Sequence, residues 1–169
     1  MARVAHSGWL LLVAAFGRIG FEPPGLTGGD PVVDGNPGTG TSPSIACADM
    51  NLGSTIGAAV ATGSTIGTGN RYPGCGGDGN DVTFGWTAPA AGRHVIDLCA
   101  SSDLWDSVLS IRDGSCTGRQ LACSDDVCGG FGAQGRVMVT LAAGQGIVIV
   151  VDSAFSGVDG DYQLAITPQ

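Results

Sequence analysis

The sequence predicts an all-β protein, and three observations lead to this fold class. The 169 residues include 30 Gly and 8 Pro, no Lys and a single Glu, so the residues that favour helix surfaces are scarce. Gly, Asp, Ser, Thr and Val are abundant instead, which suits short strands and tight turns. From Ile45 onward, short apolar alternations are separated by turn signals, a pattern typical of a sandwich or barrel.

Individual strands are expected where apolar and polar residues alternate. Asp81–Thr87 places Val82, Phe84 and Trp86 on one face, as a half-buried strand does. Gly146–Asp152 is a continuous apolar run and should lie inside the sandwich. Further strand or loop units are expected at Gly53–Gly57, Gly63–Gly67, His94–Leu98, Ser107–Asp113, Arg119–Ala122, Arg136–Leu141 and Asp161–Thr167. About eight strands in roughly 125 residues suffice for a two-sheet sandwich with one core.

The first 44 residues differ from the rest. Residues 1–20 are expected to form a signal peptide or signal anchor, because Arg3 precedes the apolar run Trp9–Phe16, which is far shorter than the ~20 residues of a membrane span. A buried strand is the alternative. Phe16 stands where a lipobox would carry its Cys, so no lipid can be attached, and cleavage is left open. Residues 21–44 are expected to be a flexible Gly/Pro-rich linker, and residues 45–169 the domain.

The charge and the cysteines narrow the function classes. A net charge of −8 with seven scattered Arg argues against nucleic-acid binding, which needs a basic surface. The cysteines are expected to form disulfides in an oxidising compartment, since no CxxC pair indicates zinc. Sequence cannot choose among the pairings of six cysteines. Our working hypothesis joins Cys116 to Cys123 between the two central runs, Cys99 to Cys128 across the acidic segments, and Cys47 to Cys75.

Four short phrases occur in the order found in a known module. They are Phe84–Gly92 (FGWTAPAAG), Trp105–Leu109 (WDSVL), Leu121–Asp126 (LACSDD) and Gly160–Ile166 (GDYQLAI). Over about Ile45 to Thr167 the chain resembles the bacterial pre-peptidase C-terminal domain, in particular its cysteine-rich versions on myxobacterial-type surface proteins. The resemblance implies a jelly-roll-like antiparallel β-sandwich that accompanies secreted enzymes or stands alone at the cell surface.

No catalytic centre is predicted. A Ser or Cys nucleophile needs a neighbouring base, and the histidines are His6, in the signal region, and His94, in a strand where it alternates with Ile96 and Leu98. That alternation favours a packed or rim-exposed side chain. Aspartates in Gly- and Ser-rich turns more often cap backbone amides than catalyse hydrolysis. The chain is therefore predicted not to be an enzyme.

A calcium site is the leading chemical hypothesis, although no cofactor is required. Asp103 and Asp106 would approach Asp125 and Asp126 if a disulfide tied the two acidic segments together. Ca²⁺ takes six to eight oxygen ligands, which clustered aspartates in irregular loops supply. The alternative is that Asp106 accepts backbone N–H groups and braces its loop. A second acidic group, Asp152, Asp159 and Asp161, is interpreted as solvated turn residues.

Trp105 is the candidate ligand-binding residue. It lies in a polar loop between Asp103 and Asp106, where an indole ring could stack on a sugar. A loop anchor folded back onto the domain is the alternative.

The predicted function is a non-enzymatic accessory or adhesion module that is secreted or displayed at the cell surface. The alternative is a Ca²⁺-dependent glycan- or matrix-binding domain, with a surface polysaccharide or an extracellular matrix protein as its partner. The mature domain is predicted to have no membrane span. Its oligomeric state stays open.

Overall fold

The computed structural model describes residues 45–102, 104–128 and 134–169; the predicted signal, the predicted linker and Asp103 lie outside them. These residues form nine strands and no helix, so no helix among them is long and apolar enough to cross a membrane. The strands are β1 (Met50–Asn51), β2 (Gly57–Ser64), β3 (Asp81–Thr87), β4 (Gly92–Asp97), β5 (Ser107–Asp113), β6 (Gln120–Ser124), β7 (Arg136–Leu141), β8 (Gly146–Ser153) and β9 (Asp161–Pro168). The all-β prediction is confirmed.

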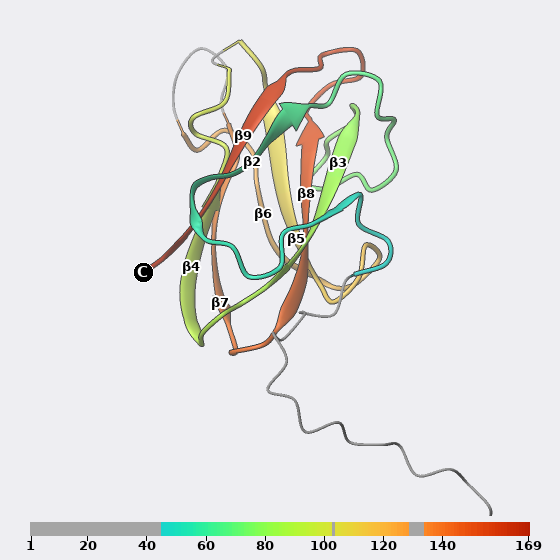
Figure 1. The fold of residues 1–169 in the computed structure, drawn as a ribbon. Coiled ribbons are helices and arrows are strands. Elements are labelled where there is room, and N and C mark those ends of the chain that lie inside the picture. The colour runs from blue at the N-terminus through green and yellow to red at the C-terminus, as the bar shows by residue number, and fades with distance from the viewer. Residues whose placement is uncertain (1–44, 103, 129–133) are drawn as a thin grey trace, which may run out of the picture. The chain divides into compact units, whose positions relative to one another are not determined.

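The strands form a two-sheet sandwich (Figure 1). One sheet has the order β1-β3-β8-β5-β6 and the other the order β2-β9-β4-β7. The predicted antiparallel sandwich is confirmed for every described strand pairing except one at an edge, where β1 runs parallel to β3, with Met50 opposite Phe84. The reason is that β1 has only two residues and is not joined to β3 by a hairpin. The chain leaves it to begin β2 in the other sheet.

The main core lies between the two sheets. Side chains alternate across a strand, so Val82, Phe84 and Trp86 of β3 all point inward, as predicted, and are at most 5% exposed. They meet Leu164 and Ile166 from β9 of the facing sheet. The Phe84 ring also packs edge-on against Tyr162, with 5.7 Å between centroids.

The outer face of the five-stranded sheet is covered as well. A second apolar cluster contains Cys116, Val148 and Val150, against which Ile45 and Tyr72 pack. Every residue of β3 is therefore buried, although the alternation predicted only one buried face. We call residues 45–49 and the segment 65–80 together the covering layer. The continuous apolar run of β8 is buried on both faces, as predicted.

The disulfides confirm one predicted pair and correct two. Cys99 is joined to Cys128, as expected. The other pairs are Cys47–Cys116 and Cys75–Cys123, so the hypothesis for these four residues is wrong. Cys116 lies in the turn at the tip of the β5–β6 hairpin, whereas Cys123 lies along β6 opposite Ser110. The hairpin separates the two sulfurs, and each is joined instead to the covering layer.

Candidate functional site

An acidic cluster lies at one end of the sandwich. Asp106 directly precedes β5, and Asp125 and Asp126 directly follow β6. Because β5 and β6 are antiparallel neighbours, the start of one strand meets the end of the other. One carboxylate oxygen from each of the three residues lies within 4.8 Å of the others. The structure thus brings together three of the four predicted metal ligands; Asp103 is outside the described residues.

The backbone at Asp126 explains how two consecutive aspartates serve one site. Successive side chains of an extended strand point to opposite faces. Asp126 instead has a φ of 54°, in the left-handed region that Asp tolerates better than most residues. This turn ends β6, and the Asp125 and Asp126 carboxylates both reach Asp106.

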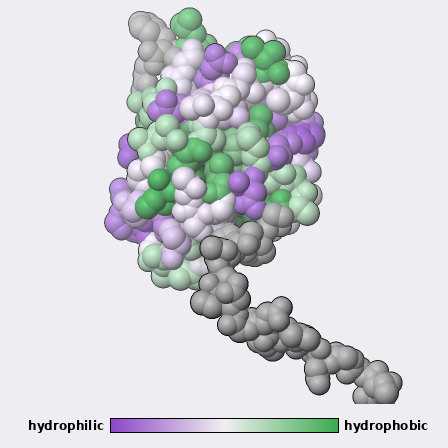
Figure 2. Space-filling model, in the orientation of Figure 1, coloured by the Kyte–Doolittle hydropathy of each residue, from purple (hydrophilic) through white to green (hydrophobic). Residues whose placement is uncertain are grey.

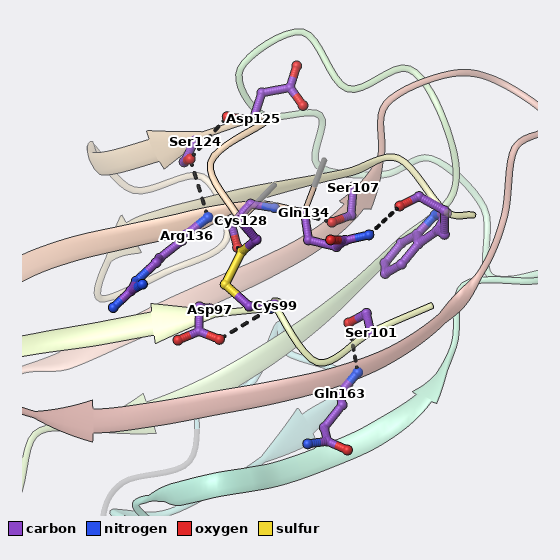
Figure 3. Close-up of a disulfide and its surroundings, with 12 residues drawn as sticks. Asp97, Cys99, Ser101, Ser107, Ser124, Asp125, Cys128, Gln134, Arg136 and Gln163 are labelled. Carbon is purple, nitrogen blue, oxygen red and sulfur yellow. Dashed lines mark hydrogen bonds between the residues drawn. A yellow bond between two sulfur atoms is a disulfide. The ribbon is translucent and has the colours of Figure 1, made fainter. Parts of the chain in front are cut away.

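The two acidic segments are tied together beneath the cluster. The Cys99–Cys128 disulfide links them, and Gln134 lies beside it (Figure 3). The Gln134 side chain donates to the carbonyls of Ser102 and Trp105, at 3.0 and 3.2 Å. The backbone carbonyl of Gln134 accepts the N–H groups of Val127 and Cys128, at 3.2 and 3.1 Å. Gln134 is 1% exposed, and no sequence motif indicates this role, since an isolated Gln belongs to none.

The cluster holds negative charge that the described residues do not neutralise. The Asp106 Oδ1 atom is buried and has no hydrogen-bond partner among them. Burial raises the pKa of Asp106, and the charge of Asp126 raises it further. Burial also raises the pKa of Asp125, with the charges of Asp126 and Asp106 adding to it, while the Asp126 N–H lowers it. The bracing alternative requires that Asp106 accept backbone N–H groups. The Oδ1 atom of Asp106 accepts none from the described residues.

Trp105 is not at a ligand surface, and that prediction is corrected. The residue is 2% exposed, and its Nε1 donates to the Ser153 hydroxyl at 3.1 Å. Gly160 lies so close to the indole that a Cβ atom there would be 2.2 Å from it. The ring fills the space beneath its own loop, because burying so large an apolar surface is favourable. The loop-anchor alternative describes Trp105 correctly.

His94 is a core residue. It is 2% exposed and packs edge-on against Trp86, with 5.2 Å between ring centroids. Its Nδ1 atom has no hydrogen-bond partner in the described part of the chain. The prediction of a packed side chain is confirmed.

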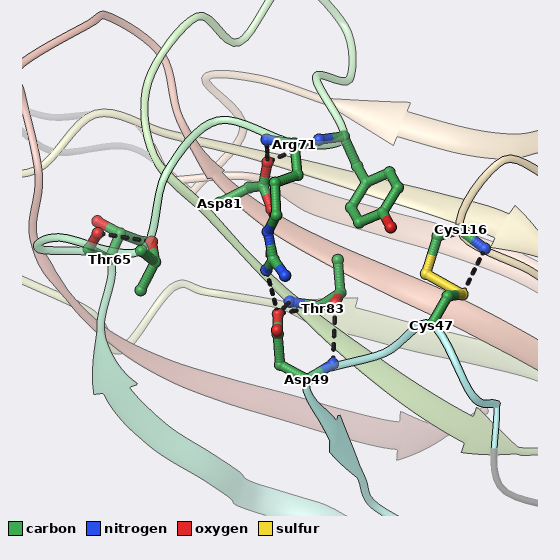
Figure 4. A network of polar contacts seen from close by, with 9 residues as sticks. Cys47, Asp49, Thr65, Arg71, Asp81, Thr83 and Cys116 are labelled. Atoms are coloured by element: carbon green, nitrogen blue, oxygen red, sulfur yellow. Dashed lines mark hydrogen bonds and ion pairs between the residues drawn. A yellow bond between two sulfur atoms is a disulfide. The ribbon is translucent and has the colours of Figure 1, made fainter.

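Another group of acidic residues lies where the covering layer packs on β3 (Figure 4), and sequence reasoning did not predict its contacts. The Asp49 carboxylate accepts the N–H and the hydroxyl of Thr83, at 2.9 and 2.8 Å, and pairs with Arg71. The hydrogen bond from Arg71 is the largest cause that lowers the pKa of Asp49, to about 2. Asp81 accepts the N–H groups of Arg71 and Tyr72. These residues are far apart in sequence and form no motif.

Asp152 is a buried acid beside Asp81, which is also buried. It lies directly opposite Asp81 between β8 and β3 and is 1% exposed. Burial raises its pKa to about 7, and the charge of Asp81 adds to the rise, whereas the N–H of Gly74 lowers it. The interpretation of Asp152 as a solvated turn residue is therefore wrong, because the covering layer lies over the end of β8.

Comparisons with known proteins add little to this geometry. No family model and no curated protein matches the chain. A solved structure, the pre-peptidase C-terminal domain of a collagenase from Bacillus anthracis, has a TM-score of 0.49 and 16% identity. The match covers 71% of this chain and 96% of that one. The chain's own geometry, a disulfide-linked β-sandwich with an acidic cluster at one end, therefore carries the functional inference.

Proposed function

We propose that the chain is a non-enzymatic accessory or adhesion module that works outside the cytoplasm and binds Ca²⁺ at Asp106, Asp125 and Asp126. The observation that carries the proposal is the convergence of three carboxylates, one of which has a buried oxygen without a partner.

The choice of Ca²⁺ follows from the donor atoms. The cluster offers carboxylate oxygens, which Ca²⁺ accepts in flexible arrangements completed by carbonyls and water. Zinc prefers nitrogen and sulfur ligands in its structural sites, but all six cysteines are in disulfides. Mg²⁺ demands a near-ideal octahedron and keeps several waters, which loops of this kind do not enforce.

Two further observations support the remainder of the proposal. Disulfides persist in oxidising compartments, and three of them join the described residues. The only histidine among those residues, His94, is enclosed in the core, so the acid–base partner of a Ser nucleophile has no candidate there. Because Trp105 is buried, it cannot serve the cluster as an aromatic platform, and we do not propose that the cluster itself binds glycans.

The proposal is tested by thermal unfolding of the oxidised full-length protein in excess Ca²⁺ and in EDTA. A ligand that binds only the native state stabilises it by about 2.7 kcal/mol at a hundredfold excess over its Kd, so we expect the Tm to rise by several degrees. Asp106→Asn should abolish the rise. The matched control Asp161→Asn, at an exposed position outside the cluster, should keep it. Coincident melts in Ca²⁺ and EDTA would refute the calcium site.

A further inference from the structure

A cavity lies between the two sheets, away from the acidic cluster. Its volume is about 310 Å³, within the range of small-molecule sites. It opens at the edge where β1 borders one sheet and β2 borders the other. Its lining residues come from both sheets and the covering layer: Asp49, Met50, Ser64, Thr68, Arg71, Val82 and Tyr162.

The polar groups of the cavity are already fixed in place. Asp49 is held by Thr83 and Arg71 (Figure 4), and both ion pairs of Arg71, with Asp49 and Asp81, use its Nη2 atom. The Thr68 hydroxyl donates to the Thr65 carbonyl at 2.8 Å, so its lone pairs remain as acceptors. A ligand would meet donors and acceptors that need no ordering, which lowers the cost of binding.

The remaining wall is apolar. Met50, Val82 and Tyr162 contribute to it, and Met50 is 43% exposed. Gly63 lets the Tyr162 hydroxyl lie against β2, because a Cβ atom at that position would be 2.4 Å from the oxygen. Figure 2 shows hydrophobic side chains gathered in the middle of the face that the segment from β1 to β2 crosses.

The charges select a neutral ligand. Two carboxylates, Asp49 and Asp81, surround one guanidinium, so an anion meets a site with excess negative charge, which disfavours its binding. A cation would have to displace Arg71, which already pairs with both carboxylates. Burial raises the pKa of the Tyr162 phenol, which keeps that hydroxyl protonated. A neutral polyol supplies hydroxyls for the polar groups and C–H surface for the apolar wall.

We propose that this cavity binds one six-membered sugar ring of a neutral glycan, without Ca²⁺. The inference rests on the proposed function in one respect, since it gives the adhesion module a class of ligand. It uses none of the three aspartates of the acidic cluster.

The test is saturation-transfer NMR and titration of the full-length oxidised protein in EDTA with maltopentaose, cellopentaose and N-acetylchitopentaose. We expect at least one of them to bind with a Kd on the order of 1 mM. Thr68→Phe, which fills the cavity, should abolish binding. Met50→Ala, which removes apolar wall, should weaken binding roughly fivefold. Both positions are exposed, so folding is preserved, which the melt in EDTA checks.

Met138→Ala is the matched control. Met138 is 47% exposed, close to the 43% of Met50. It lies on β7, the edge of the four-stranded sheet opposite to β2 and therefore away from the cavity, so this variant should bind like the wild type. No saturation transfer from any of the three glycans at about 10 mM, or binding unchanged in Thr68→Phe, would overturn the proposal. Binding of only an anionic heparin pentasaccharide would also overturn it. Because EDTA is present throughout, glycan binding is measured without Ca²⁺. The calcium proposal can therefore fail while the glycan proposal stands, and the glycan proposal can fail while the calcium proposal stands.

Discussion

The aspartates that surround Arg71 and those of the acidic cluster are the same residue type in different electrostatic situations. Asp49 and Asp81 accept five hydrogen bonds from Thr83, Arg71 and Tyr72, and the pKa of Asp49 is lowered. Asp81 Oδ1 has no hydrogen-bond partner among the described residues, but the Arg71 guanidinium lies 3.6 Å from it. Asp106 keeps a buried oxygen without a partner, and its pKa is raised. Aspartates that are paired with a cation inside the fold stabilise the fold, whereas carboxylates that converge without one mark a place where a bound cation would be favourable.

The largest effect is expected from Asp81→Ala. The change removes the acceptor for the N–H groups of Arg71 and Tyr72 and one partner of the Arg71 guanidinium. Breaking a buried pair in this way typically costs about 3–5 kcal/mol, and urea unfolding in EDTA measures it. Asp125→Ala, at the acidic cluster, should cost almost nothing in EDTA. Equal losses at the two positions would show that both regions are structural.

Removal of a disulfide is a second way to distinguish the covering layer from the acidic cluster. The double variants Cys75→Ala/Cys123→Ala and Cys99→Ala/Cys128→Ala should each lose roughly 2–4 kcal/mol. Only the second pair ties the acidic segments together, so only its removal should weaken the response of the Tm to Ca²⁺. Loss of the response in the first variant instead would mean that the covering layer holds the ion.

Asp152, which lies on β8 beneath the covering layer, should make the free energy of unfolding depend on pH. Its pKa is about 7 in the folded protein against an ordinary value of 3.8, so the folded state holds a proton that the unfolded chain loses as the pH rises above about 4. The free energy of unfolding should therefore fall from pH 4 to pH 7. Asp152→Asn should flatten this part of the profile and be more stable at pH 8, by on the order of 2 kcal/mol. If the free energy of unfolding of the variant fell between pH 4 and pH 7 as steeply as that of the wild type, Asp152 would not be the source of the pH dependence.

The smallest effect is expected from Asp126→Asn. In EDTA it removes like-charge repulsion on Asp106 and Asp125, and screening by solvent limits the gain in stability to about 0.5 kcal/mol. In Ca²⁺ the same variant should be less stable than the wild type. This reversal of sign between the two buffers, read from paired urea titrations, is specific to a metal ligand.

The fold was largely predictable because its signals are local. The alternation in β3 and the apolar run of β8 identify strands from neighbouring residues alone. The disulfides were not predictable in this way, since only one pair of the working hypothesis, Cys99–Cys128, is confirmed. The covering layer was not predictable in the same way. Its contacts, such as those between Asp49 and Arg71 or between Asp81 and Asp152, depend on the sheet order and on long loops, and no short pattern encodes them.

The candidate site was predicted in part for the same reason. Asp106, Asp125 and Asp126 were recognised because they cluster in sequence at two strand ends. Trp105 was misplaced because its polar neighbours say nothing about Gly160, whose lack of a side chain makes room for the indole. Gln134 and the residues of the cavity were missed because their roles arise only when distant segments meet.

The central claim is that the aspartate cluster without a basic partner among the described residues binds an ion, while the aspartates paired with Arg71 do not. It is tested most directly by calorimetric titration of Ca²⁺ into the metal-free protein. The account predicts saturable binding in the wild type, its loss in Asp106→Asn and its persistence in Asp49→Asn. No saturable heat in the wild type, or binding that Asp49→Asn removes and Asp106→Asn leaves intact, would contradict it.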